Sequence, residues 1–226
     1  MKSYSYKSVQ DLINSLNAGQ LLEHLSISDL PNGIEGNYVN LSAATMVFDL
    51  AGSSLSIRER GAKDYFVRHQ NIFRNLTQII YAHKGIIEKF PGDGISMHFV
   101  NTTLDKLGIV NCITHAVRTA NEIINYLITN EGMTSGFRLS LSYGDDTIAA
   151  LIGGKEHEEW ITIGHAVNVA HKLEKEIKDK HCIFGMDEDC YSVYTNIYRN
   201  GSAYRFAMPE DLKKQIKSEE FWYGVK

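Results

Sequence analysis

The sequence predicts an α+β fold, a ferredoxin-like βαββαβ sandwich with extra strands, in which helices pack on one face of a mainly antiparallel sheet. Apolar residues recur with helical periodicity in residues 61–83, 107–128 and 165–178. Short apolar runs rich in β-branched and aromatic residues lie between these segments. Glycine- and aspartate-rich connections join neighbouring runs, which is typical of hairpins.

The chain is long enough for one domain, which we expect over residues 39–226, preceded by a helical extension over residues 1–38. Apolar residues between positions 8 and 25 recur with a loosely helical rhythm, and Pro31 to Gly33 then breaks the chain. We interpret this helix as an appendage that docks on the domain or forms a dimer.

The first expected strand, Ala44 to Leu50, is a short apolar run that ends in a tight Gly-Ser-Ser loop, which places Asp49 at the end of a buried strand. After the helix of residues 61–83, Gly85 suits a C-terminal cap.

Two further strands, Ile86 to Phe90 and Ile95 to Val100, are joined by Pro91-Gly92-Asp93-Gly94, a connection short enough for a hairpin. Asp93 therefore lies at a hairpin tip. A second hairpin is expected after the helix of residues 107–128, with strands Phe137 to Tyr143 and Thr147 to Ile152 and a turn at residues 144–146.

Charge and apolar patterning exclude several classes of partner. The net charge of -4 comes from dispersed residues, without a basic block that could bind nucleic acid. No stretch approaches the roughly 20 apolar residues of a membrane span, and we expect a cytoplasmic protein. Three cysteines without a CxxC pair are expected to be buried thiols.

Asp49 and Asp93 can converge at one edge of the sheet, because the first and second strands of a βαβ order are neighbours. Two carboxylates there make an oxygen-rich site for Mg²⁺ or Mn²⁺, ions that bind through one or two carboxylates plus substrate phosphates. Gly52, Ser53 and Ser54 offer backbone N–H groups that could cradle a triphosphate. Either motif taken alone is more often an ordinary turn.

Asn168 and Lys172 lie one helical turn apart, so both side chains leave the helix of residues 165–178 on one side. An amide and an ammonium on one face could hold a ribose and a phosphate, although a solvated helix face is the commoner explanation for such a pair. No zinc-ligand spacing is followed by His157, His165, His171, His181 and Cys182, for which a surface or core role is expected. A platform for stacking on bases could be formed by Tyr191, Tyr194, Tyr198 and Tyr204, although tyrosines at near-helical spacing are more often packing residues.

Residues 43–178 resemble the catalytic domain of class III adenylate and guanylate cyclases. Four stretches match that family in order and spacing: Met46 to Gly52, Ile86 to Phe99, Phe137 to Gly153 and Ile163 to Ala170. The resemblance implies attack of the ribose 3′-hydroxyl on the α-phosphorus, with pyrophosphate leaving and two metal ions per site. It also implies a head-to-tail homodimer with its sites at the interface.

By this resemblance Asp49 and Asp93 bind both Mg²⁺ or Mn²⁺ ions, the Leu50 carbonyl assists, and Asn168 orients the ribose. Lys172 stands where the family usually has an arginine, and Ser53 and Ser54 replace the usual Phe-Thr. The family's last phosphate-binding lysine has only loose counterparts in Lys213 and Lys226.

Lys89 matches one base-reading position of adenylate cyclases, whereas the other holds Ile161, which can neither donate to a base nor accept from it. This combination resembles the bacterial pyrimidine cyclases of Pycsar antiphage defence. The resemblance implies conversion of UTP, or else CTP, to a cyclic monophosphate that activates a separate effector. An adenylate cyclase with an atypical base pocket and a catalytically silent nucleotide-binding module stay open as alternatives.

Overall fold

The computed structural model describes residues 22–25, 36–51, 57–59, 61–101, 105–154, 157–199, 201–213 and 221–226. Its strands are β1 (Leu22–Leu25), β2 (Gly36–Leu50), β3 (Ile86–Lys89), β4 (Gly94–Val100), β5 (Phe137–Gly154), β6 (His157–Ile163), β7 (Phe184–Met186), β8 (Tyr204–Ala207) and β9 (Phe221–Val225). Its helices are α3 (Ala62–Ala82), α4 (Lys106–Thr129), α5 (His165–Asp179), α6 (Glu188–Ile197) and α7 (Glu210–Lys213).

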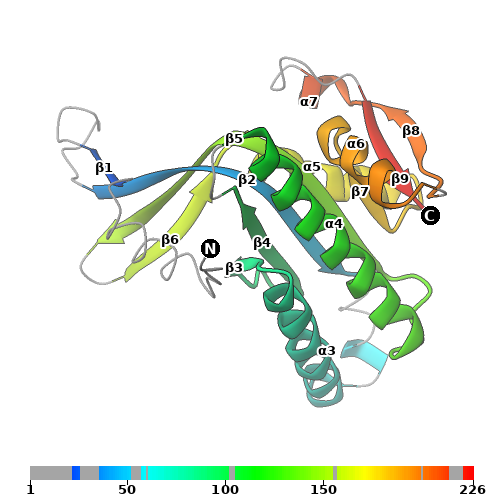
Figure 1. Ribbon diagram of the computed structural model, residues 1–226. Helices are drawn as coiled ribbons and strands as arrows, with labels where there is room; N and C mark the ends of the chain where they lie inside the picture. Colours follow the sequence, from blue (N-terminus) through cyan, green and yellow to red (C-terminus); the bar gives the residue numbers. More distant parts are fainter. Residues whose placement is uncertain are drawn as a thin grey trace.

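One sheet organises the described part of the chain, with strand order β3-β4-β2-β5-β7-β9-β8, β1 paired with β2 and β6 paired with β5. The βαββαβ core is present, and the additional strands β7, β9 and β8 extend the sheet beyond β5 (Figure 1). The long strands β2 and β5 extend beyond the core as an arm that also carries β1 and β6 (Figure 1). The predicted α+β sandwich with extra strands is confirmed.

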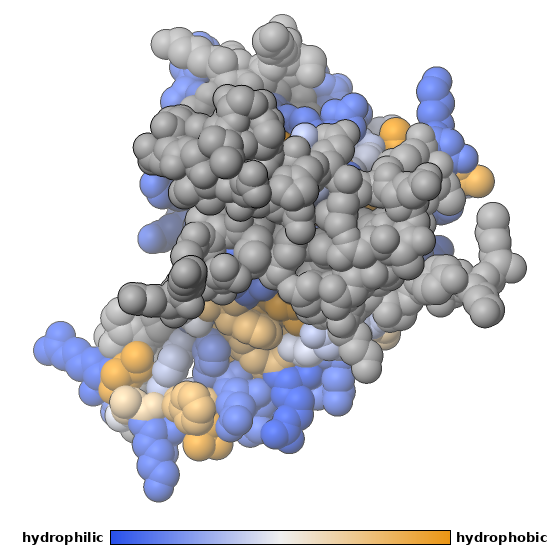
Figure 2. All heavy atoms as spheres, turned by 90° about the vertical axis from the view of Figure 1, so that its left-hand side faces the viewer, coloured by the Kyte–Doolittle hydropathy of each residue, from blue (hydrophilic) through white to orange (hydrophobic). Residues whose placement is uncertain are grey.

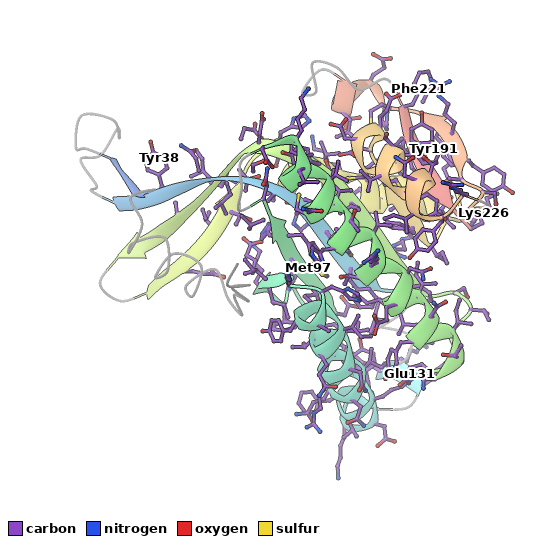
Figure 3. The ribbon with its side chains drawn as sticks, viewed as in Figure 1. Tyr38, Met97, Glu131, Tyr191, Phe221 and Lys226 are labelled. Carbon is purple, nitrogen blue, oxygen red and sulfur yellow. The ribbon has the colours of Figure 1, made fainter. Side chains whose placement is uncertain are left out.

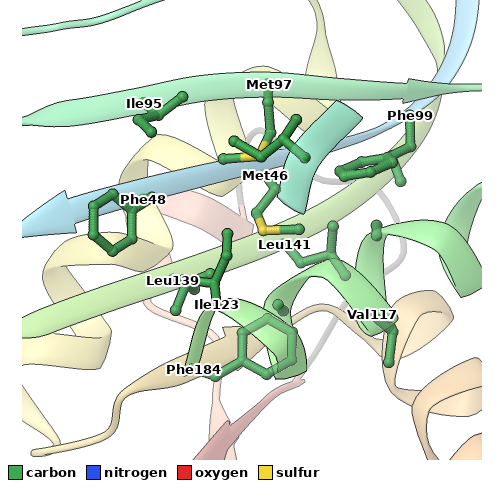
Figure 4. Packing of buried hydrophobic residues seen from close by; sticks show 14 of the residues in the cluster. Met46, Phe48, Ile95, Met97, Phe99, Val117, Ile123, Leu139, Leu141 and Phe184 are labelled. Atoms are coloured by element: carbon green, nitrogen blue, oxygen red, sulfur yellow. The ribbon is translucent and has the colours of Figure 1, made fainter. Parts of the chain in front are cut away.

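The main core lies between the sheet and the helices α3 and α4. Successive strand residues point to opposite faces, so Met46 and Phe48 pack toward α4, and Thr45 and Val47 face the other way. Figure 4 shows this packing, in which side chains from four strands meet those of α4: Met46, Phe48, Ile95, Met97, Phe99, Leu139, Leu141, Phe184, Val117 and Ile123.

Helix α5 lies on the opposite face of the sheet, which differs from the expectation that all helices cover one face. Phe184 and Met186 belong to the main core, whereas Gly185 between them faces α5. A Cβ at Gly185 would lie 2.6 Å from a side-chain carbon of Ile177, so the glycine allows the helix to approach the sheet. A second cluster with Trp222 buries the apolar side of α5.

The predicted hairpin turn at residues 144–146 is wrong, because β5 continues through it. Ala43 pairs with Gly144 and Leu41 with Thr147, so β5 holds one residue more than β2 over this span. The extra residue makes a β-bulge, which favours the same Gly and Asp residues as a turn. The hairpin forms instead between β5 and β6.

Residues 22–25 form a strand and not the end of a helix, which corrects the prediction of a helical extension over this part. The reason is tertiary pairing, since Leu22 and Leu25 align with Val39 and Gly36 in an antiparallel ladder. Residues 8–21 lie outside the described residues. Strand β2 begins at Gly36 and crosses the expected boundary at residue 38, and the division of the chain there stays a prediction.

The C-terminal elements pack through aromatic side chains (Figure 3). Tyr191 on α6 stacks on Tyr223 of β9 with 3.7 Å between ring centroids, and Tyr194 meets Phe184 edge to face. These two tyrosines are packing residues, as predicted. All three cysteines, Cys112, Cys182 and Cys190, are free and buried, and burial raises the pKa of Cys112 to about 12. No helix in the described segments is long and apolar enough to cross a membrane.

Candidate active site

The two predicted metal ligands meet where the neighbouring strands β2 and β4 adjoin the β3–β4 turn, a place that we call the metal-ligand edge or β2–β4 edge. Asp49 lies at the end of β2 opposite Gly94, and the Leu50 N–H donates a 3.2 Å hydrogen bond to the Asp93 carbonyl. A Cβ at Gly94 would lie 2.8 Å from the Phe48 carbonyl oxygen, so this position needs a glycine for the hairpin to reach β2. The convergence of Asp49 and Asp93 is therefore built into the strand register.

The charges around Asp49 favour a cation. The pKa of Asp49 is raised to about 6, mainly because the carboxyl is buried and also because the Glu174 and Asp93 carboxylates lie nearby, whereas the Arg138 guanidinium acts in the opposite direction. Arg138 binds Asp49 through Nη2 and Glu174 through Nε. The Lys178 ammonium also lowers the pKa of Asp49, so three carboxylates, Asp49 included, are offset by two cationic side chains. The remaining deficit of positive charge is one that a divalent ion would offset.

The donor set also fits a hard cation. An ionised carboxylate offers about four lone-pair sites, and Arg138 contacts one oxygen of Asp49, so acceptor capacity remains. Within the described residues no group of three or more His, Cys, Asp or Glu side chains could hold a metal ion. Two carboxylates suit Mg²⁺ or Mn²⁺ when substrate phosphates complete the coordination, so Asp49 and Asp93 fit such a site.

The two predicted base-reading residues also lie near each other, although on strands far apart in the chain. Lys89 ends β3, and Ile161 lies half-buried on β6, paired with Ala150 of β5. The carboxylate of Glu88 joins the two strands, because its Oε1 accepts a 2.8 Å hydrogen bond from the Thr162 N–H and lies 3.5 Å from Lys89 Nζ.

Asn168 and Lys172 lie on α5, as expected, where Asn168 is exposed and Lys172 half-buried. Helix α5 starts close to the β5 bulge, where Asp146 Oδ1 accepts from the His165 N–H at 3.2 Å. A Cβ at Gly164 would lie 2.8 Å from the Thr147 Cα, so the bulge and this glycine fix the start of the helix. Gly52, Ser53 and Ser54 lie outside the described residues.

Of the two loosely matched C-terminal lysines, the structure describes the side chain of Lys226 and not that of Lys213. Lys226 follows β9, and its Nζ lies 4.8 Å from the Tyr204 ring centroid. Lys213 ends α7, and its side chain lies outside the described part. A phosphate-binding role for either lysine stays a prediction.

Sequence reasoning missed several residues around the metal-ligand edge. The strand register places Arg138 opposite Asp49, and Arg138 in turn binds Glu174 of α5, but nothing in their local sequence marks either residue. A small cavity of about 80 Å³ beside Leu50 and Ala51 is also lined by Arg68 and His69 of α3. Burial lowers the pKa of His69, and the nearby Asp93 carboxylate opposes this effect.

Apolar surface lies close to this edge. Phe66 on α3 and Phe90 before the hairpin are 60% and 52% exposed, and they border a shallow groove along α3. Figure 2 shows apolar side chains among polar ones toward the lower end of the molecule, at the level of α3 in Figure 1.

Several solved structures share this fold. A bacterial light-regulated adenylyl cyclase has a TM-score of 0.65 at 18% identity, with 84% of this chain aligned to 52% of that chain. The adenylyl cyclase CyaB from P. aeruginosa has a TM-score of 0.61 at 16% identity, covering 84% of this chain and 95% of that chain. The guanylate cyclase domain of RhGC from Catenaria anguillulae, in complex with GTP, has a TM-score of 0.62 at 16% identity, covering 83% and 97%.

The chain spans about half the length of the light-regulated cyclases that it matches. No family model matches the sequence, and no curated protein does. These structural neighbours are adenylyl and guanylyl cyclases, and each aligns with more than four fifths of this chain. The chain therefore has the fold of the class III nucleotidyl cyclase domains.

Proposed function

We propose that this protein is a nucleotidyl cyclase that converts a nucleoside triphosphate to its 3′,5′-cyclic monophosphate and pyrophosphate. The observation that carries the proposal is the convergence of Asp49 and Asp93 at the β2–β4 edge. In-line phosphoryl transfer needs charge compensation at the triphosphate and a positioned hydroxyl, and little else from the protein.

Asp49 and Asp93 would hold Mg²⁺ or Mn²⁺, with help from the Leu50 carbonyl. Bound ions would supply charge compensation at the phosphates and acidify the 3′-hydroxyl. Asn168 would hold the ribose so that its 3′-oxygen faces the α-phosphorus, and the Lys172 ammonium would stabilise negative charge that develops there. Gly52, Ser53 and Ser54 would bind the triphosphate through their backbone N–H groups.

The active unit would be a homodimer in which one protomer supplies the aspartates and its partner supplies Asn168 and Lys172. Each protomer carries both sets, on the β2–β4 edge and on α5 respectively, so a head-to-tail pair would have two equivalent sites.

The base pocket favours a pyrimidine, with UTP ahead of CTP. Lys89 can donate to a carbonyl oxygen, and uracil carries two, whereas Ile161 cannot pair with the amino group of adenine. The product would then be a second messenger for a separate effector protein, in the manner of the Pycsar antiphage systems. Lys172 in place of an arginine favours a second candidate, a catalytically silent nucleotide-binding module, because lysine lacks the planar donor fork.

Incubating the purified protein with ATP, GTP, CTP and UTP in turn, with Mn²⁺, and separating the products by chromatography tests the proposal. We expect cyclic UMP as the main product, together with pyrophosphate. Cyclic AMP as the main product would rule out the pyrimidine assignment. Nucleotide binding without pyrophosphate release from any of the four would favour the silent module.

A further inference from the structure

A buried carboxylate connects two strands that share no backbone pairing in the described sheet. Strand β3 pairs with β4 at one edge, whereas β6 pairs with β5. Glu88 lies at a register shift between Ile87 and Lys89, so its side chain leaves the ladder and reaches β6. Only 1% of this side chain is exposed.

Four groups surround the Glu88 carboxylate. Oε1 accepts from the Thr162 N–H and faces the Lys89 ammonium. Oε2 accepts from the Ser96 hydroxyl at 2.8 Å and lies 3.3 Å from His98 Nε2. An ionised carboxylate can only accept, so a hydrogen bond from His98 to Glu88 requires the proton on Nε2. Thr162 Oγ1 lies 3.1 Å from the same nitrogen, and Thr45 Oγ1 lies 3.0 Å from the other ring nitrogen.

We propose that Glu88, held by His98 and Ser96, is a positioning residue that sets the spacing between Lys89 and Ile161 and thereby selects the base. This inference rests on the proposed function, because it takes Lys89 and Ile161 as the residues that face the base. Glu88 itself is buried, so it would not contact the base. One carboxylate oxygen contacts both the N–H of Thr162, the neighbour of Ile161, and the ammonium of Lys89, so the separation of the two base-reading residues depends on it.

The charge state of the network agrees with this role. Burial alone would raise the pKa of Glu88, but the hydrogen bond and the charge of His98, with hydrogen bonds from Ser96 and Thr162, lower it to about 2. A buried, hydrogen-bonded charge seldom stabilises a fold more than apolar packing would, and such a group can instead specify one arrangement. His171 on α5 also lies within electrostatic reach of Glu88, Lys89 and His98, so the network extends toward the helix that carries Asn168.

Glu88→Gln tests the inference with almost no change of volume. The amide offers one acceptor oxygen where the carboxylate offers two, and its NH₂ group would face a donor of the network. We expect the ratio of kcat/KM for the preferred nucleotide to that for the next best to fall at least about 10-fold. Glu159→Gln removes an exposed carboxylate from β6, the strand that carries Ile161, and should leave that ratio within about 2-fold.

Ser96→Ala removes one hydrogen bond to Glu88. This variant tests the positioning role of Glu88 if Glu88→Gln fails to fold. We expect a smaller loss of selectivity in the same direction, with the melting temperature recorded for both variants. An unchanged ratio in a folded Glu88→Gln or, failing that, in Ser96→Ala would overturn the inference. If the wild-type protein cyclises no nucleotide, the proposed function fails on its own. In that case the dissociation constants of the wild type and Glu88→Gln for the four nucleoside triphosphates are measured by calorimetry. Their ratios test the positioning role of Glu88, since discrimination in binding needs no turnover.

Discussion

Arg138 lies directly opposite Asp49 in the register of β5 and β2, and its guanidinium donates to the Asp49 carboxylate. The same guanidinium donates through Nε to Glu174 on α5. A guanidinium is planar, with its donors in a fixed fork, so it can orient two carboxylates at once. Arg138 therefore connects the metal-ligand edge to the helix of Asn168 and Lys172 within one chain.

Removing the Asp93 carboxylate should abolish turnover and leave the fold intact. Asp93→Asn removes the charge that would hold the divalent ions, and we expect pyrophosphate release to fall at least about 100-fold with Mn²⁺. Asp64→Asn changes an exposed carboxylate on α3 and serves as the control. Undiminished release in Asp93→Asn would refute the metal assignment.

Asp49→Asn should make the metal-free protein more stable at pH 8, although it removes activity. Because the pKa of Asp49 is about 6 in the fold and 3.8 ordinarily, its ionised form is disfavoured in the native state. The ionised Asp49 carboxylate therefore lowers the free energy of unfolding above pH 6, and this destabilisation disappears as the pH falls toward 4. With partial solvent screening we expect a gain of about 1 kcal/mol at pH 8. The free energies of unfolding of the wild type and Asp49→Asn are measured by chemical denaturation with a chelator at pH 8 and pH 4. A less stable variant at pH 8 would contradict the argument.

Lys172 should act on the transition state. Lys172→Ala should lower kcat about 100-fold with KM changed by less than about 3-fold, because the ammonium would act mainly on charge that develops in the reaction. Lys172→Arg keeps the charge and supplies more donors, so it should retain at least the wild-type kcat. Initial rates over a range of nucleotide concentrations separate the two constants, and an unchanged kcat in Lys172→Ala would exclude this role.

Two inactive variants should restore activity when combined. In a dimer of Asp93→Asn with Asn168→Ala, one site carries both defects and the other carries neither. The purified mixed dimer should therefore reach about half the wild-type rate. The two chains are co-expressed with different tags, and the doubly purified dimer is assayed. If the mixed dimer is no more active than its parents, the sites do not lie between protomers.

The sequence was sufficient to predict the elements that depend on a local pattern of apolar residues or on a short connection. Helices α3, α4 and α5 begin and end within two residues of the predicted segments, because each buries a continuous apolar stripe. The hairpin that presents Asp93 was also predicted, since its four-residue connection permits little else.

Prediction failed where distant strands decide the conformation. Gly144 to Asp146 has the composition of a turn, and only its pairing with β2 makes it a bulge. Glu88, His98 and Thr162 come from three strands, so no local spacing reveals their network. The one available signal is a charged residue and a histidine inside otherwise apolar strands of a single hairpin.

The burial of every native thiol makes this protein a convenient scaffold for site-specific labelling. Cys112, Cys182 and Cys190 are inaccessible in the folded chain, and burial raises the pKa of both Cys112 and Cys182, so few thiolates exist at neutral pH. A maleimide dye should therefore attach to a single cysteine introduced at exposed Glu159, with no need to replace the native ones. Fluorescence from that position on β6 could then follow nucleotide binding directly.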